Sequence, residues 1–541
     1  MSLTISSELL ALTNCDGLAR LRKIQSGSHR DGETRLDTTT LSESDLADLK
    51  RVFEEGDNSR SAKAVDAILK ARRGEADTVV PNFAAFEEIL RIYLSSGAIE
   101  GWVFKLEDDG KMHPYLVTSI ATHTSRQQEE PRVDLKLVGY TAQSTTSENV
   151  MAAQTKVVSF TAGMAARRRV SSILQAVGIY KETDALHEEY RASLERYRKI
   201  VAPQFAEQFR VTGNVHQTGY SWHSKDSDKE LVRRKVVHDL SEKDYRAFNP
   251  LAEAGYGGAK QDAKPKEGRV PEHLLVRVFD LGSHESYWVH SDYMEPYVYD
   301  KTLGDKLILP ESHRDLLSVL TTNLEDFTED FIEGKRAGNV ILCKGRPGVG
   351  KTLTAEIYAE LIERPLYSIH SGTLGTSANE IERALKLVYA RAKRWNCVLL
   401  LDEADVFVAQ RGGDVNKNAI VAEFLRTMEY FDGLMFMTTN RPDDIDDAII
   451  SRCIAVIEYT APSTDLARRS WMAIEGQFGV KLDDSLREDL LKMFPEIVQR
   501  DIKMLLKLVL KMKKGGKGEL DLDSFRRAAM FRAIKIKDLG A

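Results

Sequence analysis

One glycine-rich segment of this 541-residue chain combines residue types that can bind phosphate. It reads GRPGVGKT, and its members are Gly345, Arg346, Pro347, Gly348, Val349, Gly350, Lys351 and Thr352. Closely spaced glycines let backbone N–H groups converge on phosphate oxygens, while Lys351 can reach the β- and γ-phosphates and the Thr352 hydroxyl can ligate Mg²⁺. The segment therefore predicts a site for a nucleoside triphosphate and Mg²⁺, and we expect the next residue, Leu353, to contact the nucleotide as well.

The elements on either side of this segment suit that chemistry. The apolar run NVILC (339–343) predicts a buried strand before it, and TLTAEIYAELIE (352–363) predicts a helix after it. Backbone N–H groups and the dipole at a helix N-terminus attract anions, so a strand, a loop and a helix in this order form a phosphate site. A chance match would need neither flanking element, and the context therefore favours the phosphate-binding interpretation.

Two carboxylates and one amide follow further apolar runs. Asp402 and Glu403 come directly after CVLLL (397–401), which predicts a buried parallel strand, and Asn440 follows the run 434–439. Ligands of α/β sheets bind at the carboxyl ends of the strands. Asp402 can bind the Mg²⁺ water shell, Glu403 can act as the base for an attacking water, and Asn440 can orient that water. Taken alone, these residues would be turn acids and a strand-end cap, but their order after the glycine-rich segment favours catalysis.

The motifs GRPGVGKT, VLLLDEADVF, TTNRPDDID and DDAIISRC occur in the order and approximate spacing of AAA ATPases. The chain resembles that family over roughly residues 307–503. The segments LYSIHSGTLGTSANEIERAL, RWNCVLLLDEADVF and FLRTMEYFDGLMFMTTNR are similar to a branch found in bacterial, viral and fungal AAA proteins. The resemblance implies an α/β core with a five-stranded parallel sheet, a helical lid from about Pro462, ATP and Mg²⁺ as ligands, and hexameric rings with ATP between subunits.

Two arginines take their expected roles from the resemblance. Arg452 matches the arginine finger, which neutralises charge developing on the γ-phosphate of a neighbouring subunit, although a surface salt bridge is the alternative. The nearby second arginine of many AAA proteins is absent. Arg500, in QRDIK, matches a lid residue that contacts the nucleotide, and an exposed lid arginine is the alternative there.

Other positions depart from the family pattern. Gly372, Thr373, Leu374 and Gly375 align with the pore loop, where protein-threading AAA rings generally have an aromatic residue. Either Leu374 and the backbone grip the substrate, or the substrate is not threaded processively. Arg346 replaces a proline and should leave phosphate binding intact, and Arg411 fits a solvated loop better than a subunit interface.

Length and composition limit the architecture. A chain of 541 residues exceeds what one core usually organises, so we expect several domains. We predict a helical, partly flexible N-terminal segment (1–75), an α+β region that binds a substrate or partner (76–300), a large ATPase subdomain (301–461) and a helical lid (462–541). Predicted strands in the second region are GWVFKL (101–106), YLVTSI (115–120), VDLKLVGY (133–140), LLVRVFD (274–280) and ESYWVHS (285–291).

The same half of the chain has weaker signals. We expect a polar break over 26–45, a helix over 182–201 and a linker over 254–271. Arg167, Arg168 and Arg169 are interpreted as a solvated helix face rather than a phosphate contact. His216 and His223 flank GYSW without metal-ligand spacing, so an ordinary turn is favoured over zinc. Tyr220, Trp222 and Trp288 are expected in the core.

Charge and hydropathy restrict the function classes. A net charge of −6 gives no general attraction to nucleic acid. Four scattered cysteines, Cys15, Cys343, Cys397 and Cys453, predict a reducing compartment without disulfides. No run of 18 apolar residues occurs, and Glu8 interrupts the apolar N-terminal stretch, so we expect a cytoplasmic protein without membrane insertion.

These observations predict an ATP-hydrolysing homo-oligomer, expected to be a hexamer, that remodels an unidentified protein target as a chaperone does. The alternative is a nucleotide-gated assembly factor or scaffold that does little mechanical work, which the missing pore aromatic favours. A nucleic-acid motor is a third class, and the acidic balance of the chain disfavours it.

Overall fold

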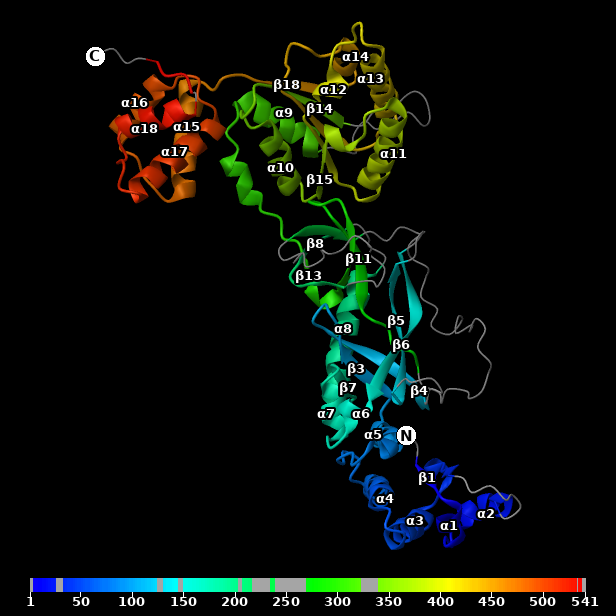
Figure 1. Ribbon diagram of the computed structural model, residues 1–541. Coiled ribbons are helices and arrows are strands. Elements are labelled where there is room, and N and C mark those ends of the chain that lie inside the picture. Colours follow the sequence, from blue (N-terminus) through cyan, green and yellow to red (C-terminus); the bar gives the residue numbers. More distant parts are fainter. Residues whose placement is uncertain are drawn as a thin grey trace.

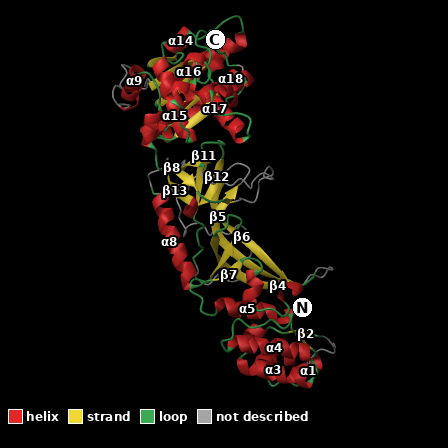
Figure 2. Ribbon diagram, turned by 90° about the vertical axis from the view of Figure 1, so that its left-hand side faces the viewer, coloured by secondary structure: helices red, strands yellow, loops and turns green. Residues whose placement is uncertain are grey.

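The computed structural model describes residues 3–25, 33–123, 130–144, 149–202, 207–216, 234–238, 269–322, 339–532 and 534–537. These residues form an elongated molecule (Figure 1). Helices occupy one end, two antiparallel sheets follow, and an α/β unit with an adjoining helical bundle occupies the other end. Figure 2 shows the same sequence of layers from the side. Within the described ranges, no helix is both long enough and apolar enough to cross a bilayer.

The N-terminal end consists mainly of short helices. They are α1 (Ser7–Ala11), α2 (Ala19–Gln25), α3 (Glu43–Glu55), α4 (Ser59–Arg72) and α5 (Phe86–Ser95), with a small pair of strands, β1 (Thr4–Ile5) and β2 (Thr34–Arg35). Buried side chains from Leu3 onward belong to one hydrophobic cluster that also contains Val103, Leu135 and Phe160 of the following sheet. The predicted boundary near residue 75 is therefore crossed by a continuous core, which does not suit a loosely attached segment.

The next layer is a five-stranded antiparallel sheet with the order β6-β5-β4-β3-β7. Its strands are β3 (Trp102–Leu106), β4 (Met112–His123), β5 (Arg132–Ser144), β6 (Asn149–Thr161) and β7 (Ile179–Lys181). Short helices α6 (Ala162–Ala165) and α7 (Val170–Gln175) follow β6. The three predicted strands of this region lie within β3, β4 and β5, as their alternating patterns indicated.

A long helix, α8 (Asp184–Ile200), leads to a six-stranded sheet with the order β13-β8-β10-β11-β12-β9. Its strands are β8 (Gln208–Val211), β9 (Val215–His216), β10 (Lys235–His238), β11 (Leu275–Asp280), β12 (Ser286–His290) and β13 (Met294–Pro296). The helix expected over 182–201 and the two strands expected over 274–280 and 285–291 are confirmed.

The α/β unit contains a parallel sheet with the order β15-β16-β17-β14-β18. Its elements are β14 (Asn339–Gly345), α10 (Lys351–Leu361), β15 (Leu366–His370), α11 (Ala378–Arg394), β16 (Val398–Asp402), α12 (Asp405–Val408), α13 (Val415–Met428), β17 (Leu434–Thr439), α14 (Asp447–Ile450) and β18 (Ala455–Tyr459), and helix α9 (Glu311–Thr322) precedes them. The five parallel strands and the flanking helices confirm the predicted α/β fold class.

Four helices at the C-terminal end form a bundle with its own core. They are α15 (Thr464–Phe478), α16 (Asp484–Met493), α17 (Gln499–Lys514) and α18 (Leu522–Phe531). Trp471, Leu490, Leu505 and Phe525 are fully buried in it. This bundle is the helical lid expected from about Pro462.

The six-stranded sheet packs directly on the α/β unit. Phe279 of β11 lies with its ring 4.8 Å from that of Trp395 and 5.8 Å from that of Tyr367. Val237 of β10 belongs to the same hydrophobic cluster. The predicted division near residue 300 therefore separates chain segments that share a core.

Some N-terminal predictions are wrong or fall outside the description. Helix α3 begins at Glu43, inside the predicted polar break. Arg167, Arg168 and Arg169 are exposed, but they lie in a turn between α6 and α7 rather than on a helix face. His216 ends β9 instead of lying in a turn, and Trp288 is buried as expected. His223, Tyr220, Trp222 and most of the predicted linker lie outside the described residues.

Candidate active site

The glycine-rich segment joins β14 to α10 at the carboxyl edge of the parallel sheet. β14 ends at Gly345 and α10 begins at Lys351. Gly345 has φ of +150°, and a Cβ there would lie 2.4 Å from the backbone oxygen of Tyr459, so only glycine fits this close approach. Gly350, with φ of +102°, is the N-cap of α10. The loop therefore directs the helix N-terminus and its free N–H groups toward the edge of the sheet.

Lys351 is a buried cation with no ion pair to a carboxylate among the described residues. Its side chain points into the site, and its residue is only 6% exposed. The ammonium donates to the backbone oxygens of Gly345 (2.8 Å) and Arg346 (2.9 Å) and to Oδ1 of Asn440 (2.9 Å). Burial lowers the pKa of Lys351 below its ordinary value. A buried ammonium held by neutral oxygens is incompletely compensated, which suits it to an anionic ligand.

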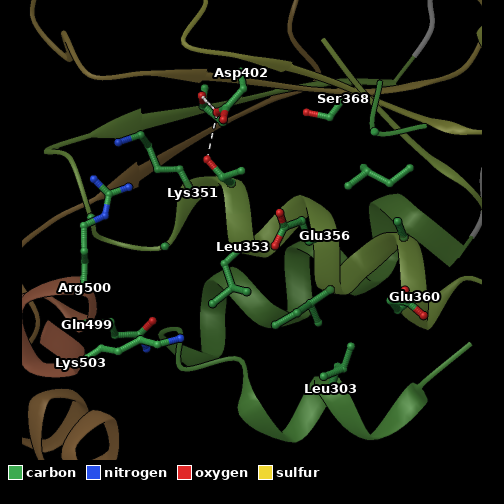
Figure 3. Close-up of a pocket in the computed structure, with 18 of the residues that line it drawn as sticks. Leu303, Lys351, Leu353, Glu356, Glu360, Ser368, Asp402, Gln499, Arg500 and Lys503 are labelled. Atoms are coloured by element: carbon green, nitrogen blue, oxygen red, sulfur yellow. Dashed lines mark hydrogen bonds between the residues drawn. The ribbon is translucent and has the colours of Figure 1, made fainter. Parts of the chain in front are cut away.

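Thr352 and Asp402 form the second part of the site. The Thr352 hydroxyl donates to Oδ1 of Asp402 at 2.9 Å, and the Thr438 hydroxyl donates to the same oxygen at 2.6 Å. Figure 3 shows Lys351 and Asp402 on the same side of the site. A hydroxyl beside a carboxylate is a donor set that Mg²⁺ accepts when it also binds phosphates, so these two residues fit that ion.

Glu403 and Asn440 are held by contacts between neighbouring strands. Glu403 has φ of +54°, an uncommon conformation for a residue other than glycine, and its N–H donates to the Thr438 hydroxyl at 3.0 Å. Asp405 accepts hydrogen bonds from the Thr439 hydroxyl (2.6 Å) and from the Asn440 N–H (2.9 Å). An unfavourable backbone conformation persists only where the surrounding structure holds it in place, and such residues cluster at functional sites. The Glu403 side chain is exposed in this conformation.

A cavity of about 1740 Å³ extends from this loop to the lid and to the six-stranded sheet. Most of the predicted site residues line it: Pro347, Gly348, Gly350, Lys351, Thr352, Leu353, Asp402, Glu403, Asn440 and Arg500. Gly345, Arg346 and Val349 belong to the loop but do not line the cavity. The Val349 side chain instead packs against the core on one side of the sheet. The cavity therefore gathers nearly the whole predicted nucleotide site.

The lid contributes cations to the same cavity. Figure 3 shows Gln499, Arg500 and Lys503 at the start of α17, across from the phosphate loop. The Arg500 N–H lies 3.5 Å from the Gly348 oxygen. Arg346 points away and pairs with Glu496 at 3.3 Å, and both side chains are largely exposed. The lid thus meets the loop that is expected to hold phosphate.

Three further residues singled out in the sequence lie outside the cavity. Arg452 pairs with Glu429 and donates to the Ala448 oxygen. Arg411 is exposed in a loop, as expected, and its guanidinium makes two hydrogen bonds to Asp446, at 2.7 and 3.1 Å. Leu374 is only 3% exposed and belongs to the core beneath the sheet.

Sequence reasoning missed several residues of the site. Asp405 lies inside the quoted motif VLLLDEADVF, yet its partners come more than 30 residues later. Lys235 reaches the cavity from the start of β10 and Arg234 from the residue before that strand, whereas Lys503 reaches it from the lid. No local pattern links these three cations to the phosphate loop, because their approach depends on how the sheets and the lid pack.

Residues 341–460 match the family model described as "ATPase family associated with various cellular activities (AAA)". The chain is 30% identical over 153 residues to the 26S proteasome subunit RPT4 of Saccharomyces cerevisiae, covering 26% of this chain and 35% of that protein. It is 29% identical over 179 residues to the proteasome-activating nucleotidase of Methanococcus vannielii, covering 30% and 43% respectively. It is 28% identical over 173 residues to the zinc metalloprotease FtsH 3 of Synechocystis, covering 29% and 27%.

These matches span well under two thirds of each relative. A crystal structure of a FIGL-1 AAA domain covers 44% of this chain and 86% of its own at 18% identity, with a TM-score of 0.36, a likeness too weak to bear on the fold. The chain thus contains an AAA ATPase domain with relatives among AAA+ proteins.

Proposed function

We propose, from the AAA domain in residues 341–460, that the protein binds ATP with Mg²⁺ and hydrolyses it in a homo-hexameric ring that remodels a protein target. The observation that carries ATP binding is the buried Lys351 ammonium at the N-terminus of α10, whose described hydrogen bonds all go to neutral oxygens. The relatives named for the proteasome support a protein target, since proteasomes act on proteins.

In this proposal phosphate oxygens replace the neutral oxygens as hydrogen-bond partners of the Lys351 ammonium. The backbone N–H groups of Gly348 and Gly350 and the helix dipole of α10 add to the attraction. Thr352 and Asp402 hold Mg²⁺, which neutralises part of the charge on the phosphates. Arg500 and Lys503 approach from the lid and complete the positive surroundings. Leu353, 39% exposed, offers an apolar contact beside the nucleotide.

Glu403 and Asn440 are assigned to the water that attacks the γ-phosphate. Glu403 accepts a proton from that water, and the Asn440 amide orients it. Asn440 also touches Lys351, so one side chain joins the water position to the phosphate position. Positioning and electrostatics supply most of the acceleration in such a transfer.

Arg452 is assigned to the site of the neighbouring subunit. It lies outside the cavity of its own chain, and its ion pair with Glu429 is partly exposed, so little free energy opposes its release. A guanidinium that approaches the γ-phosphate in trans stabilises the charge that develops there in the transition state.

The first test measures two quantities for wild type, Glu403→Gln and Arg452→Ala. They are the particle mass by light scattering, with and without ATP, and the rate of ATP hydrolysis. We expect Glu403→Gln to form a hexamer-sized particle with ATP, and Arg452→Ala to lose hydrolysis by roughly 10³-fold, the size of arginine-finger effects. Arg73→Ala is the matched control, because Arg73 also makes one exposed ion pair, with Glu43. A monomeric Glu403→Gln with ATP, together with unchanged hydrolysis in Arg452→Ala, would refute the shared site.

A second function is favoured by Leu374. In the pore-loop position this side chain is buried in the core, so it is not presented to a threaded chain. That supports a nucleotide-gated scaffold or assembly factor with little mechanical work. A partner that is first captured with Glu403→Gln and then incubated with the wild type would distinguish the two functions. During ATP turnover by the wild type, a remodeller makes this partner more sensitive to protease, whereas a scaffold leaves its sensitivity unchanged.

A further inference from the structure

Two histidines and one aspartate converge far from the nucleotide cavity, among the antiparallel sheets. Oδ2 of Asp109 lies 2.8 Å from Nε2 of His113 and 3.2 Å from Nδ1 of His216. The side chains of Asp109, His113 and His216 are 0%, 1% and 11% exposed. One donor atom from each residue thus lies within 4.8 Å of the others, in a position nearly closed to solvent.

Three separate chain segments place these residues. Asp109 belongs to the tight turn between β3 and β4, in which Gly110 has φ of +80° and Glu107 exchanges backbone hydrogen bonds with Gly110 and Lys111. His113 is the second residue of β4, and His216 ends β9 opposite Trp288 of β12. The Asp109 backbone oxygen also accepts from the Tyr293 hydroxyl at 2.9 Å. The three donors therefore connect the five-stranded sheet to the six-stranded sheet.

The charge of Asp109 has no Lys or Arg partner within the described part of the chain. The adjacent Lys111 ammonium is bound to Asp292 at 2.9 Å instead. Among the residues that the structure describes, the carboxylate's hydrogen-bond partners are the two imidazoles and the Lys111 backbone N–H, 3.0 Å from Oδ1. A fully buried carboxylate normally requires a cation or a metal ion.

Two more histidine rings surround this group. The rings of His273 and His290 lie 4.6 and 5.4 Å from the ring of His113. His273 donates from Nε2 to the Pro114 backbone oxygen, and His290 accepts from the Asp292 N–H, so neither is needed as a ligand. The Nδ1 atoms of His113 and His273 have no hydrogen-bond partner in the described residues. Hydrogen bonding alone therefore does not explain why the imidazoles gather here.

We propose that Asp109, His113 and His216 bind a divalent transition-metal ion, with Zn²⁺ as the ion that their chemistry fits best. Two imidazoles and one carboxylate are a ligand set of Zn²⁺, whereas Mg²⁺ and Ca²⁺ prefer oxygen ligands. Zinc bonds of about 2.0–2.2 Å place tetrahedral donors about 3.3–3.6 Å apart. The separations of 2.8 and 3.2 Å then need to open by about 0.1–0.8 Å.

The ion would join the two antiparallel sheets. Its ligands come from both sides of their contact, because His216 lies more than 100 residues after Asp109 and His113 in the chain. The fourth coordination position has no side chain assigned and is left for water. This role does not depend on ATP hydrolysis, because the site lies outside the nucleotide cavity.

The test uses the full-length protein freed of metal by a chelator, with Zn²⁺ added against a chromophoric competitor, and Co²⁺ as a spectroscopic probe. We expect one Zn²⁺ per chain and a Co²⁺ absorption typical of a four-coordinate site. Asp109→Asn, His113→Gln and His216→Gln should each weaken Zn²⁺ binding at least tenfold, because each removes one of three ligands. His123→Gln is the matched control, since His123 lies on the same strand as His113 and is 53% exposed.

Circular dichroism of the metal-free variants separates loss of a ligand from loss of the fold. His216→Gln is the decisive variant because it changes the most exposed of the three side chains. A folded His216→Gln protein that binds Zn²⁺ as tightly as wild type would overturn the proposal. So would a wild-type protein that binds no stoichiometric Zn²⁺ and gives no Co²⁺ spectrum.

Discussion

Asp405 accepts hydrogen bonds from Thr439 and Asn440 and thereby fixes the end of β17 against the start of α12. The Asn440 amide in turn contacts Lys351. An acidic side chain without its own place in the cavity lining thus controls where the amide points. At the scale of single residues, the site is a network that spans strands β16 and β17 rather than a set of independent groups.

Asp405→Ala is expected to lower ATP turnover by roughly 10²-fold, the cost of a displacement of about 1 Å at a catalytic group. ATP affinity should change less, because the hydrogen bonds described for Asp405 go to Thr439 and Asn440 rather than to the phosphate loop. Steady-state hydrolysis and nucleotide binding by fluorescence measure the two quantities. Asp443→Ala, an exposed carboxylate in the following loop, is the control. A turnover equal to that of the control would remove Asp405 from the network.

Lys351, Thr352, Asp402 and Glu403 could be predicted because each stands inside or directly after a contiguous pattern. Asp405 stands in such a pattern too, but its task is set by Thr439 and Asn440, and a side chain's distant partner leaves no trace in local spacing. The same reason hid the Asp109, His113 and His216 group, because local ligand spacing considered only His216 and His223 and favoured an ordinary turn there. The functional roles of all these residues remain predictions that the experiments above test.

At the scale of elements, β11 and α11 meet through aromatic and cationic side chains. Phe279 lies between Tyr367 and Trp395, and the Arg391 guanidinium is 4.6 Å from the centre of its ring. Such contacts add to the burial of the ring itself. The six-stranded sheet is therefore fastened to the ATPase domain by a packed core, which the division of the chain by composition did not indicate.

Phe279→Ala is expected to destabilise the protein by about 3–5 kcal/mol, the usual cost of removing a buried phenyl group. Urea unfolding followed by tryptophan fluorescence measures the change, since Trp395 contacts the ring. The control is Phe531→Ala, whose side chain is 82% exposed, and we expect it to stay within about 0.5 kcal/mol of wild type. Equal midpoints for the two variants would contradict a shared core.

Glu360, near the end of α10, provides a second link between the ATPase domain and the six-stranded sheet. Its carboxylate accepts from Lys235 (2.6 Å), the Tyr297 hydroxyl (2.7 Å) and the Asp300 N–H (3.1 Å). Burial raises the pKa of Glu360, but the ion pair and hydrogen bonds with Lys235 and Tyr297 outweigh it and hold the pKa below its ordinary value.

A carboxyl with a lowered folded-state pKa stabilises the fold above its unfolded pKa, about 4.3 for Glu, and loses this effect as pH falls through the folded value. We therefore expect Glu360→Gln to melt at a lower temperature than wild type at pH 7, by the equivalent of about 1.5–3 kcal/mol. The difference should shrink below about pH 4. Thermal melts at pH 7, 5 and 3.5 measure it, and a difference that stays constant with pH would exclude the charged link.

Helix α3 shows why element boundaries were missed. The Ser42 side chain accepts from the Asp45 N–H, and the Asp45 side chain accepts from the Ser42 N–H, so the two residues cap the helix together. The Ser- and Asp-rich stretch therefore starts a helix instead of breaking one. The same residue types favour turns and helix N-termini, and composition alone does not separate the two outcomes. Strands β14, β16 and β17 of the ATPase core were easier, because each contains an apolar run that leads directly to residues of the predicted site.

At the scale of the whole molecule, the contacts of Phe279 and Glu360 imply that the ATPase part is not autonomous. A fragment of residues 301–541 would expose Tyr367 and Trp395, which are nearly fully buried in the intact chain. We expect this fragment to bind a hydrophobic dye and to melt below the full-length protein, whereas a fragment that begins at residue 207 retains the six-stranded sheet and should not. Equal melting temperatures and dye binding would support a division at residue 300.

Helix α10 connects the phosphate loop to the six-stranded sheet as a rigid rod. Lys351 stands at its start, and Glu360 stands nine residues later, roughly 14 Å away at 1.5 Å per residue. A tilt of about 5° at the loop would displace Glu360 by about 1.2 Å on this geometry, a large fraction of its 2.6 Å contact with Lys235. The helix is in this sense a lever arm: small changes around the phosphates become ångström-sized movements where the N-terminal half is attached.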